Sequence, residues 1–292
     1  MNEIHKRIAD AKEVLNLEAS ALQNLSDTLD ASFSEAVNYI VKCEGRVVFT
    51  GMGKSAIIAS KISASFNSTG TPSLFMHAAD AIHGDLGMVQ ASDVVVCLSK
   101  SGNTEEVKTL IPLIKERGNV LIGISAEKNS YLGQHANVLL VTPMDREACP
   151  HNLAPTTSTT LQLALGDALM VAVLNEKDFT EADFARYHPG GSLGKRLFLK
   201  VSDLMGGFSK PQVNPETPVL EVILEISNKM SGCTAVIGEQ HIKGIITDGD
   251  IRRMLQQSTD FSALNAADIM SAYPVSLPSD TLALDALKLM NK

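Results

Sequence analysis

The sequence predicts an α/β protein with a doubly wound, five-stranded parallel sheet, followed by a smaller α+β module at the C-terminus. Short apolar runs rich in β-branched residues alternate with helical segments over the first two thirds of the chain. This alternation is typical of a parallel sheet that helices cover on both faces. Beyond about residue 200 the alternation ends and an internal repeat begins, which indicates a second domain.

Local patterns predict the elements of the sheet domain. Apolar residues at helical spacing predict one long amphipathic helix in the first 30 residues, suited to packing on the domain or on a partner subunit. Buried strands are predicted at residues 46–50, 73–77, 93–99, 120–125 and 138–141. Helices are predicted at residues 55–66, 104–117 and 157–174. The apolar stretch 161–174 is shorter than a membrane span and contains Asp167, so we expect a core helix there.

The C-terminal part carries the repeat. Gly, Pro, Lys and Ser gather around residues 195–215, as in the segment 206–211, and we therefore assign domains to residues 1–197 and 198–292. Residues 201–205 resemble residues 266–270, and residues 217–222 resemble residues 281–286, at an offset of 64 or 65 residues. The first repeat covers about 201–263, and the second, about 264–292, stops after its first helix.

Composition and charge exclude several classes of partner. The 292 residues carry a formal net charge of −8, whereas a nucleic-acid-binding surface needs clustered Lys and Arg. The same charge disfavours binding to anionic membranes. The N-terminus has no apolar signal segment. The four cysteines are far apart in the sequence, and we expect them to be reduced thiols of a cytosolic protein: Cys43, Cys97, Cys149 and Cys233. We therefore expect a cytoplasmic protein with neither a nucleic-acid nor a membrane partner.

Ligands of open α/β sheets bind at the carboxyl ends of the strands, and two loops there carry suitable groups. The first loop, Gly51–Ser55, opens a helix with small residues and places Lys54 just inside that helix. It is not a Walker A loop, because Val48 stands where a glycine is needed. It is a weak match to a dinucleotide fingerprint, since no acidic residue ends the second strand. Backbone N–H groups at Gly53 and Ser55 can hold a ligand closely, and Lys54 adds a positive charge.

The second loop combines hydroxyl groups with the start of a helix. Ser99, Ser101 and Thr104 lie beside Gly102 where the next helix is predicted to begin. Hydroxyls, exposed amides and the helix dipole together make a phosphate site. A Ser/Thr cap with a tight turn is the alternative, but two such loops after two adjacent strands favour phosphate binding.

Five other side chains are candidates for acid–base chemistry or ligand contact. Glu106 lies in the first turn of the helix after the second loop, where it could instead only stabilise the helix dipole. Glu147 follows the fifth strand and could be a solvated surface carboxylate. His188 lies in a Gly/Pro turn and could be a loop residue with its hydrogen bonds satisfied locally. His77 and His83 follow the second strand; they form no metal signature by themselves, and packing is the alternative role.

Taken together, these stretches resemble the D-arabinose 5-phosphate isomerases. That family joins a sugar isomerase (SIS) domain, with a flavodoxin-like sheet, to a pair of CBS motifs. The resemblance runs in order along almost the whole chain, and its specificity lies in the combination of segments. These segments are residues 51–55, 83–88, 99–102, 147–150, 153–160 and 188–191 in the SIS part, and 247–253 at the end of a first CBS motif.

The resemblance implies an activity and a set of site residues. The family interconverts D-arabinose 5-phosphate and D-ribulose 5-phosphate for the synthesis of Kdo, a sugar of lipopolysaccharide and some capsules, and its members form homotetramers. The catalytic positions carried over by motif are Lys54, Glu106, Glu147 and His188. Substrate and phosphate contacts are expected at Gly53, Ser55, Thr71, His77, His83, Ser99, Ser101, Gly102 and Thr104. The family needs no cofactor and no metal, although zinc inhibits it and a histidine that matches His77 can bind zinc.

Aldose–ketose isomerisation fits these groups. The reaction must open the sugar ring, remove a proton from C2 and return it to C1 through an enediol, which requires a base and an acid that serves the two oxygens. We expect one of Glu106 and Glu147 to be the base and His188 to assist ring opening or oxygen proton transfer. Lys54 is expected to stabilise the enediolate.

Two alternative functions stay open. A relative with this fold could isomerise another phosphosugar, such as a phosphoheptose, although the CBS-like repeat and residues 147–150 argue against it. A non-catalytic phosphosugar sensor is the other alternative, but such regulators commonly carry a basic helix-turn-helix, and no such segment precedes residue 45. Paired CBS motifs normally bind an adenine nucleotide, and the early end of the second motif argues against a nucleotide partner here.

Overall fold

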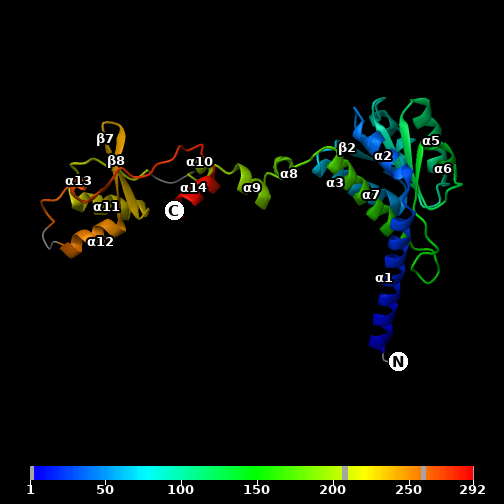
Figure 1. The fold of residues 1–292 in the computed structure, drawn as a ribbon, viewed down its shortest axis with the longest axis horizontal. Coiled ribbons are helices and arrows are strands. Elements are labelled where there is room, and N and C mark those ends of the chain that lie inside the picture. Colours follow the sequence, from blue (N-terminus) through cyan, green and yellow to red (C-terminus); the bar gives the residue numbers. More distant parts are fainter. Residues whose placement is uncertain (1–2, 206–209, 258–260, 292) are drawn as a thin grey trace. The chain divides into compact units, whose positions relative to one another are not determined.

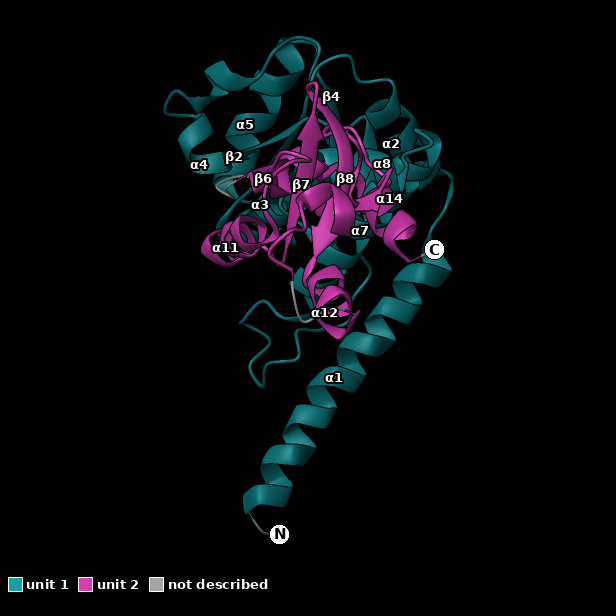
Figure 2. Ribbon diagram, turned by 90° about the vertical axis from the view of Figure 1, so that its left-hand side faces the viewer, with its two compact units in different colours: residues 1–194 teal, residues 195–292 magenta. Residues whose placement is uncertain are grey.

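The computed structural model describes residues 3–205, 210–257 and 261–291. The chain divides into two compact units, residues 1–194 and 195–292, which Figure 2 colours separately. Part of the Gly- and Ser-rich segment on which we based the domain boundary, residues 206–209, lies outside the described residues. Helix α9 (Ser192–Phe198) contains both the predicted boundary at 197/198 and the division between the units, and the domain limits stay a prediction.

The first unit is built on a parallel sheet of five strands in the order β2-β1-β3-β4-β5, which confirms the predicted doubly wound fold. Figure 1 draws this unit in blue to green. The strands lie where the apolar runs predict them: β1 (Val47–Gly51), β2 (Ser73–His77), β3 (Val94–Leu98), β4 (Val120–Ser125) and β5 (Val138–Val141). Strands β1 and β3 are buried at every position, because helices cover both of their faces. Such strands are continuous apolar runs and show no polar alternation.

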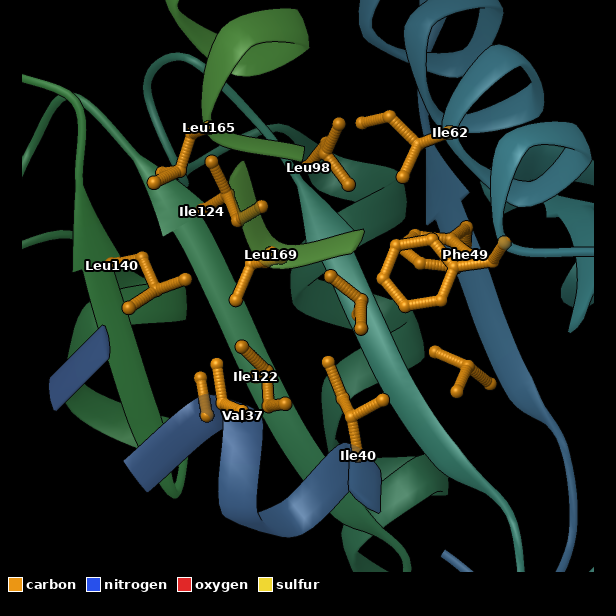
Figure 3. Close-up of a cluster of buried hydrophobic side chains, with 14 of the residues drawn as sticks. Val37, Ile40, Phe49, Ile62, Leu98, Ile122, Ile124, Leu140, Leu165 and Leu169 are labelled. Carbon is orange, nitrogen blue, oxygen red and sulfur yellow. The ribbon is translucent and has the colours of Figure 1, made fainter. Parts of the chain in front are cut away.

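Helices cover the sheet in two layers. One layer contains α2 (Ala31–Val41), α3 (Gly53–Ser68), α7 (Thr157–Glu176) and the end of α1 (Glu3–Thr28), and Figure 3 shows its core. The other layer contains α4 (Ala78–Ala81), α5 (Glu105–Glu116) and α6 (Tyr131–His135). Successive strand residues point to opposite layers, so that Val48 packs in the second core and Phe49 in the first.

The N-terminal helix α1 is as long as the apolar spacing predicts, but little of it packs on its own unit. Leu25 is buried, whereas Ile8 and Leu15 are 50% and 65% exposed. Helix α2 follows directly and is not predicted by the apolar pattern. It begins at Asp30, whose carboxylate accepts a hydrogen bond from the backbone N–H of Ser32 at 2.9 Å and so caps the helix.

Helix α7 is the one helix among the described residues that is long and apolar enough to cross a membrane. Its residues Leu165, Leu169 and Val173 are instead buried against the sheet and α3, which confirms the predicted core helix. Gly166 lets α7 approach α3 closely, because a Cβ at this position would lie 2.6 Å from Ile62 Cγ1.

The second unit contains a mixed sheet in the order β6-β7-β8-β9, formed by Gln212–Val213, Cys233–Gly238, His241–Thr247 and Ser271–Ala272. Its helices are α10 (Val201–Leu204), α11 (Val219–Lys229), α12 (Asp248–Gln257), α13 (Ala266–Ile269) and α14 (Ala283–Met290). Helices α10 and α13 are equivalent, as are α11 and α14, at the spacing of the predicted repeat. The two repeats pair reciprocally, because Lys200 bridges Leu282 and Asn265 bridges Pro218. This exchange supports the internal repeat, whose limits stay a prediction.

Candidate functional site

The register of the first sheet brings three strand ends together. Gly51, the last residue of β1, pairs with His77 at the end of β2 and with Leu98 at the end of β3. The segments that follow these strands therefore leave the sheet side by side at its carboxyl edge. Both loops that the sequence predicts as ligand-binding lie there, in the position where open α/β sheets bind ligands.

The first loop turns directly into helix α3. Gly53 has a φ of +57°, a left-handed conformation that favours glycine, and an added Cβ would meet no atom within 4 Å. Lys54 is exposed and Ser55 half-buried in the first turn of α3. The N–H groups of a first helical turn have no partner within the helix, so this turn and Lys54 together offer donors and a positive charge to an anion.

The second loop is held in shape by its own hydroxyl groups. Ser99 Oγ accepts a hydrogen bond from Gly102 N at 3.1 Å, and Ser101 Oγ accepts one from Asn103 N at 3.3 Å. Gly102 has a φ of +61°, and an added Cβ would lie 2.6 Å from the Cβ of Ser130, so that only glycine fits without a shift. Since each serine uses an acceptor lone pair in these bonds, its hydroxyl hydrogen stays available to a ligand oxygen.

Helix α5 begins directly after this loop. Thr104 is its N-cap residue but makes no capping bond, and among the described residues its buried Oγ1 has no hydrogen-bond partner. Glu106 is half-buried in the first turn, and the part of the chain that the structure describes offers its carboxylate no hydrogen bond or ion pair. Its neighbour Glu105 differs, because Lys108 Nζ donates to that carboxylate at 3.0 Å. Of the two acids at this helix start, Glu106 is therefore the one whose carboxylate has no partner among the described residues.

Glu147 is fully buried between β5 and α7. Its Oε1 accepts hydrogen bonds from Ser158 Oγ at 2.6 Å and Lys100 Nζ at 2.9 Å. Its Oε2 accepts bonds from the backbone N–H groups of Thr156 at 2.9 Å and Ser158 at 3.1 Å. Burial by itself raises the pKa of Glu147, but the hydrogen bonds from Lys100, Ser158 and Thr156 outweigh it and lower the pKa from 4.5 to about 2. The alternative of a solvated surface carboxylate is therefore wrong.

Lys100 is a site residue that the sequence reasoning did not single out. It stands between the two serines of the second loop, and its carbonyl oxygen accepts bonds from Ala126 N at 3.0 Å and Ser125 Oγ at 3.1 Å. Its ammonium group reaches Glu147. Lys100 thus connects the segments that follow β3, β4 and β5. A cation between two hydroxyl residues of a predicted phosphate loop was the signal that could have identified it.

The two histidines near the end of β2 have different surroundings. His77 caps α4, because its Nδ1 accepts a hydrogen bond from Ala79 N at 3.3 Å, and Asp80 lies 4.0 Å from the same nitrogen. His83 is exposed, next to the short helix η1 (Asp85–Met88). Within residues 3–205, 210–257 and 261–291, no group of three or more His, Cys, Asp or Glu side chains is placed to hold a metal ion.

Thr71 does not lie at the carboxyl edge of the sheet. It precedes β2, so it lies at the amino edge, where Lys177 Nζ at the end of α7 donates to Thr71 Oγ1 at 3.1 Å. Gly70 beside it lies against Tyr187, the last residue of α8 (Glu181–Tyr187).

His188 belongs to the same amino edge, because it follows Tyr187 as the C-cap residue of α8. Its ring stacks on Phe184 with the centroids 3.9 Å apart. Its Nδ1 lies 2.9 Å from the carbonyl oxygen of Phe184, which can only accept a hydrogen bond. The neutral ring therefore carries its proton on Nδ1 and presents Nε2 as an acceptor. One copy of the chain does not bring His188 to Lys54 and Glu106.

Comparisons with known proteins extend this description. The SIS domain family matches residues 40–172, and the CBS domain family matches residues 201–257. Arabinose 5-phosphate isomerase KdsD of Yersinia pestis is 44% identical over 281 residues, which are 96% of this chain and 86% of that protein. The chain belongs to the arabinose 5-phosphate isomerase family. A further relative of this isomerase is KpsF of Escherichia coli O6:H1 strain CFT073, 43% identical over 290 residues, with 98% of this chain and 88% of that protein covered.

A solved structure resembles the SIS part of this isomerase. The Escherichia coli CFT073 protein in complex with arabinose 5-phosphate superposes with a TM-score of 0.62 and is 41% identical, covering 65% of this chain and 100% of that chain. These matches confirm the family that the sequence motifs resemble. The isomerase gathers most of the predicted site residues at one sheet edge, whereas Thr71 and His188 lie at the other.

Proposed function

We propose that this chain interconverts D-arabinose 5-phosphate and D-ribulose 5-phosphate, and that its product supplies Kdo synthesis in the cytoplasm. The observation that carries the proposal is the 43–44% identity, over nearly the whole chain, to arabinose 5-phosphate isomerases. The resemblance to a protein solved with arabinose 5-phosphate supports it. So does the pair of anion-binding loops at the carboxyl edge, since the substrate is a phosphate ester.

The phosphate group binds at the start of α5. Ser99 and Ser101 donate their hydroxyl hydrogens to it. The buried Oγ1 of Thr104, which has no hydrogen-bond partner among the described residues, is a third donor. The first-turn N–H groups and the helix dipole add to this attraction. A chain with a net charge of −8 can bind the dianion in this way, because the donors are local.

Proton transfer takes place beside this phosphate site. The base removes the proton from C2 of the open-chain aldose, leaves an enediolate that Lys54 stabilises, and returns the proton to C1. At the same time O1 gains a proton and O2 loses one. Of the two candidate carboxylates, Glu106 is the better placed base, because no partner competes for its lone pairs among the described residues. A positioned base contributes about 10²–10⁴-fold to the rate.

His188 and Thr71 serve the site of a neighbouring copy in a homotetramer. Both lie at the amino edge of their own sheet, so a contact with substrate at a carboxyl edge requires a second subunit. The exposed Ile8 and Leu15 of α1 support self-association, because a helix with exposed apolar residues gains from burying them. In the neighbour's site, His188 Nε2 is the acceptor that assists ring opening.

Direct turnover tests the activity. The purified chain is incubated with D-arabinose 5-phosphate, and D-ribulose 5-phosphate is followed by NMR. Conversion is the expected result. If another pentose or hexose phosphate gave a higher kcat/KM than D-arabinose 5-phosphate, that sugar would replace D-arabinose 5-phosphate as the proposed substrate. Tight phosphosugar binding without conversion would favour the alternative function, a non-catalytic phosphosugar sensor.

Subunit mixing tests the shared site. His188→Gln and Glu106→Gln chains are each expected to lose most activity, and co-expressed mixed tetramers are expected to regain part of it, because some sites then hold both native residues. Co-expression that leaves the activity at the level of the single variants would contradict a contribution from the neighbour.

A further inference from the structure

The contacts of Glu147 leave its carboxylate no capacity for a substrate proton. A carboxylate has about four lone-pair sites. In Glu147 these sites receive Lys100 Nζ and Ser158 Oγ on Oε1, and the N–H groups of Thr156 and Ser158 on Oε2, to which the Thr156 hydroxyl also donates at 3.3 Å. The side chain is also 0% exposed. A proton on either oxygen would displace one of these donors, which explains why the pKa is held at about 2.

The ammonium of Lys100, unlike the Glu147 carboxylate, has hydrogen-bonding capacity left for a ligand. It has three N–H donors and directs one of them to Glu147. Its side chain is 41% exposed, so the other donors can reach a ligand. Four further donors, the N–H and hydroxyl groups of Thr156 and Ser158, also share the charge of Glu147, so the positive charge of Lys100 is only partly neutralised.

The position of Lys100 matches that of Lys54. Gly51 and Leu98 are paired at the ends of β1 and β3. Lys54 follows the first of these residues by three positions, and Lys100 follows the second by two. Two lysines therefore leave adjacent strand ends at the carboxyl edge, and the Lys100 backbone is fixed by Ala126 and Ser125.

We infer that Lys100 contacts an anionic oxygen of the substrate, and that Glu147 is a positioning residue that holds the Lys100 ammonium at the carboxyl edge. The inference rests on the proposed isomerase function and assigns proton transfer at C1 and C2 to Glu106. The anionic oxygen belongs either to the enediolate or to the phosphate, and the experiment distinguishes the two.

The first test replaces Lys100 with Met and with Arg. For each variant, kcat and KM are measured with D-arabinose 5-phosphate, and the affinity is measured for D-arabinitol 5-phosphate, an alditol that cannot isomerise. We expect Lys100→Met to lower kcat/KM about 100-fold and Lys100→Arg to restore part of the loss, as for removal of a group that stabilises an oxyanion. A fall in kcat with unchanged alditol affinity identifies the enediolate. A rise in KM with a matching loss of alditol affinity identifies the phosphate.

The second test separates positioning from proton transfer. Glu147→Gln is measured alone and in the Lys100→Met background. If Glu147 acts through Lys100, the double variant is within about threefold of Lys100→Met, because the partner is already gone. A further loss of about 10²–10⁴-fold would make Glu147 a proton carrier and overturn the assignment. Thermal unfolding of each variant shows that the loss is not a loss of fold.

Failure of the inference and failure of the proposed function give different results. A wild-type chain that does not convert D-arabinose 5-phosphate contradicts the function, and the Lys100 contact is then decided by the alditol affinity alone. A Lys100→Met chain within threefold of wild type in kcat/KM and in alditol affinity overturns the contact while the function stands. If the wild type is inactive, equal affinities of the wild type and Lys100→Met for D-arabinitol 5-phosphate also overturn the Lys100 contact.

Discussion

Gly53 and Gly102 form a matched pair of glycines in the two loops at the carboxyl edge. Their φ angles are +57° and +61°, so an alanine at either position costs about 1–2 kcal/mol for its left-handed backbone. Their surroundings differ. A Cβ at Gly53 would meet no atom within 4 Å, whereas one at Gly102 would lie 2.6 Å from Ser130 Cβ and 3.1 Å from Ser125 Oγ.

We expect Gly102→Ala to be less stable than Gly53→Ala by about 1–3 kcal/mol, the usual cost of overpacking a well-filled interior. A change of 1 kcal/mol shifts the Tm of a domain of this size by about 2–4 °C, so the Tm of Gly102→Ala is expected about 2–12 °C below that of Gly53→Ala. Thermal unfolding followed by circular dichroism measures both variants under one set of conditions.

Gly53→Ala is the control that carries the backbone cost alone. Comparison of the two variants therefore isolates the crowding by Ser130, which is itself buried at the start of α6. Equal Tm values would refute this reasoning, because they would show that the second loop accepts a methyl group without cost.

Three further predictions concern other parts of the chain. The lowered pKa of Glu147 contributes stability that is complete above about pH 4.5 and is lost as the pH falls toward 2, a change of about 3 kcal/mol. Urea unfolding at about pH 3 and pH 6 should show this pH-dependent component in the wild type and not in Glu147→Gln. Leu165→Ala removes a core side chain that Figure 3 labels and should lower the free energy of unfolding of the first unit by about 2–5 kcal/mol, measured in urea. Asp250→Ala leaves the N–H and hydroxyl of Thr247 without their acceptor, and should cost the second unit about 1–3 kcal/mol in the same measurement while isomerase activity is unchanged.

The sheet was predictable because each of its strands is a short apolar run with local boundaries. Fully buried strands such as Val94–Leu98 show this pattern most clearly. The pattern predicts α1 but not the following helix α2, although α2 buries Ala36, Val37 and Ile40. The capping residue Asp30 marks the break between them, and a search for caps would have found it.

The site was only partly predictable, because some of its contacts join residues far apart in the sequence. Loops such as 99–104 carry their chemistry locally, in hydroxyls and glycine before a helix. The pairing of Lys100 with Glu147 depends on how β3, β4 and β5 are ordered, which no local pattern encodes. The position of Thr71 at the amino edge could have been predicted from the sequence, because Thr71 precedes a predicted strand of a parallel sheet.

Helix α7 has a consequence for how the sites of an assembled enzyme influence one another. Its first turn holds Glu147 through Ser158, and Lys177 just beyond its last turn holds Thr71. Twenty helical residues separate these contacts by about 30 Å, and such a packed helix moves as one rod. If Thr71 serves a neighbouring subunit, a ligand that moves Lys100 and with it Glu147 in one copy also moves a group in the site of the next. Cooperativity in substrate binding would then depend on how rigidly α7 transmits a displacement from one of its ends to the other.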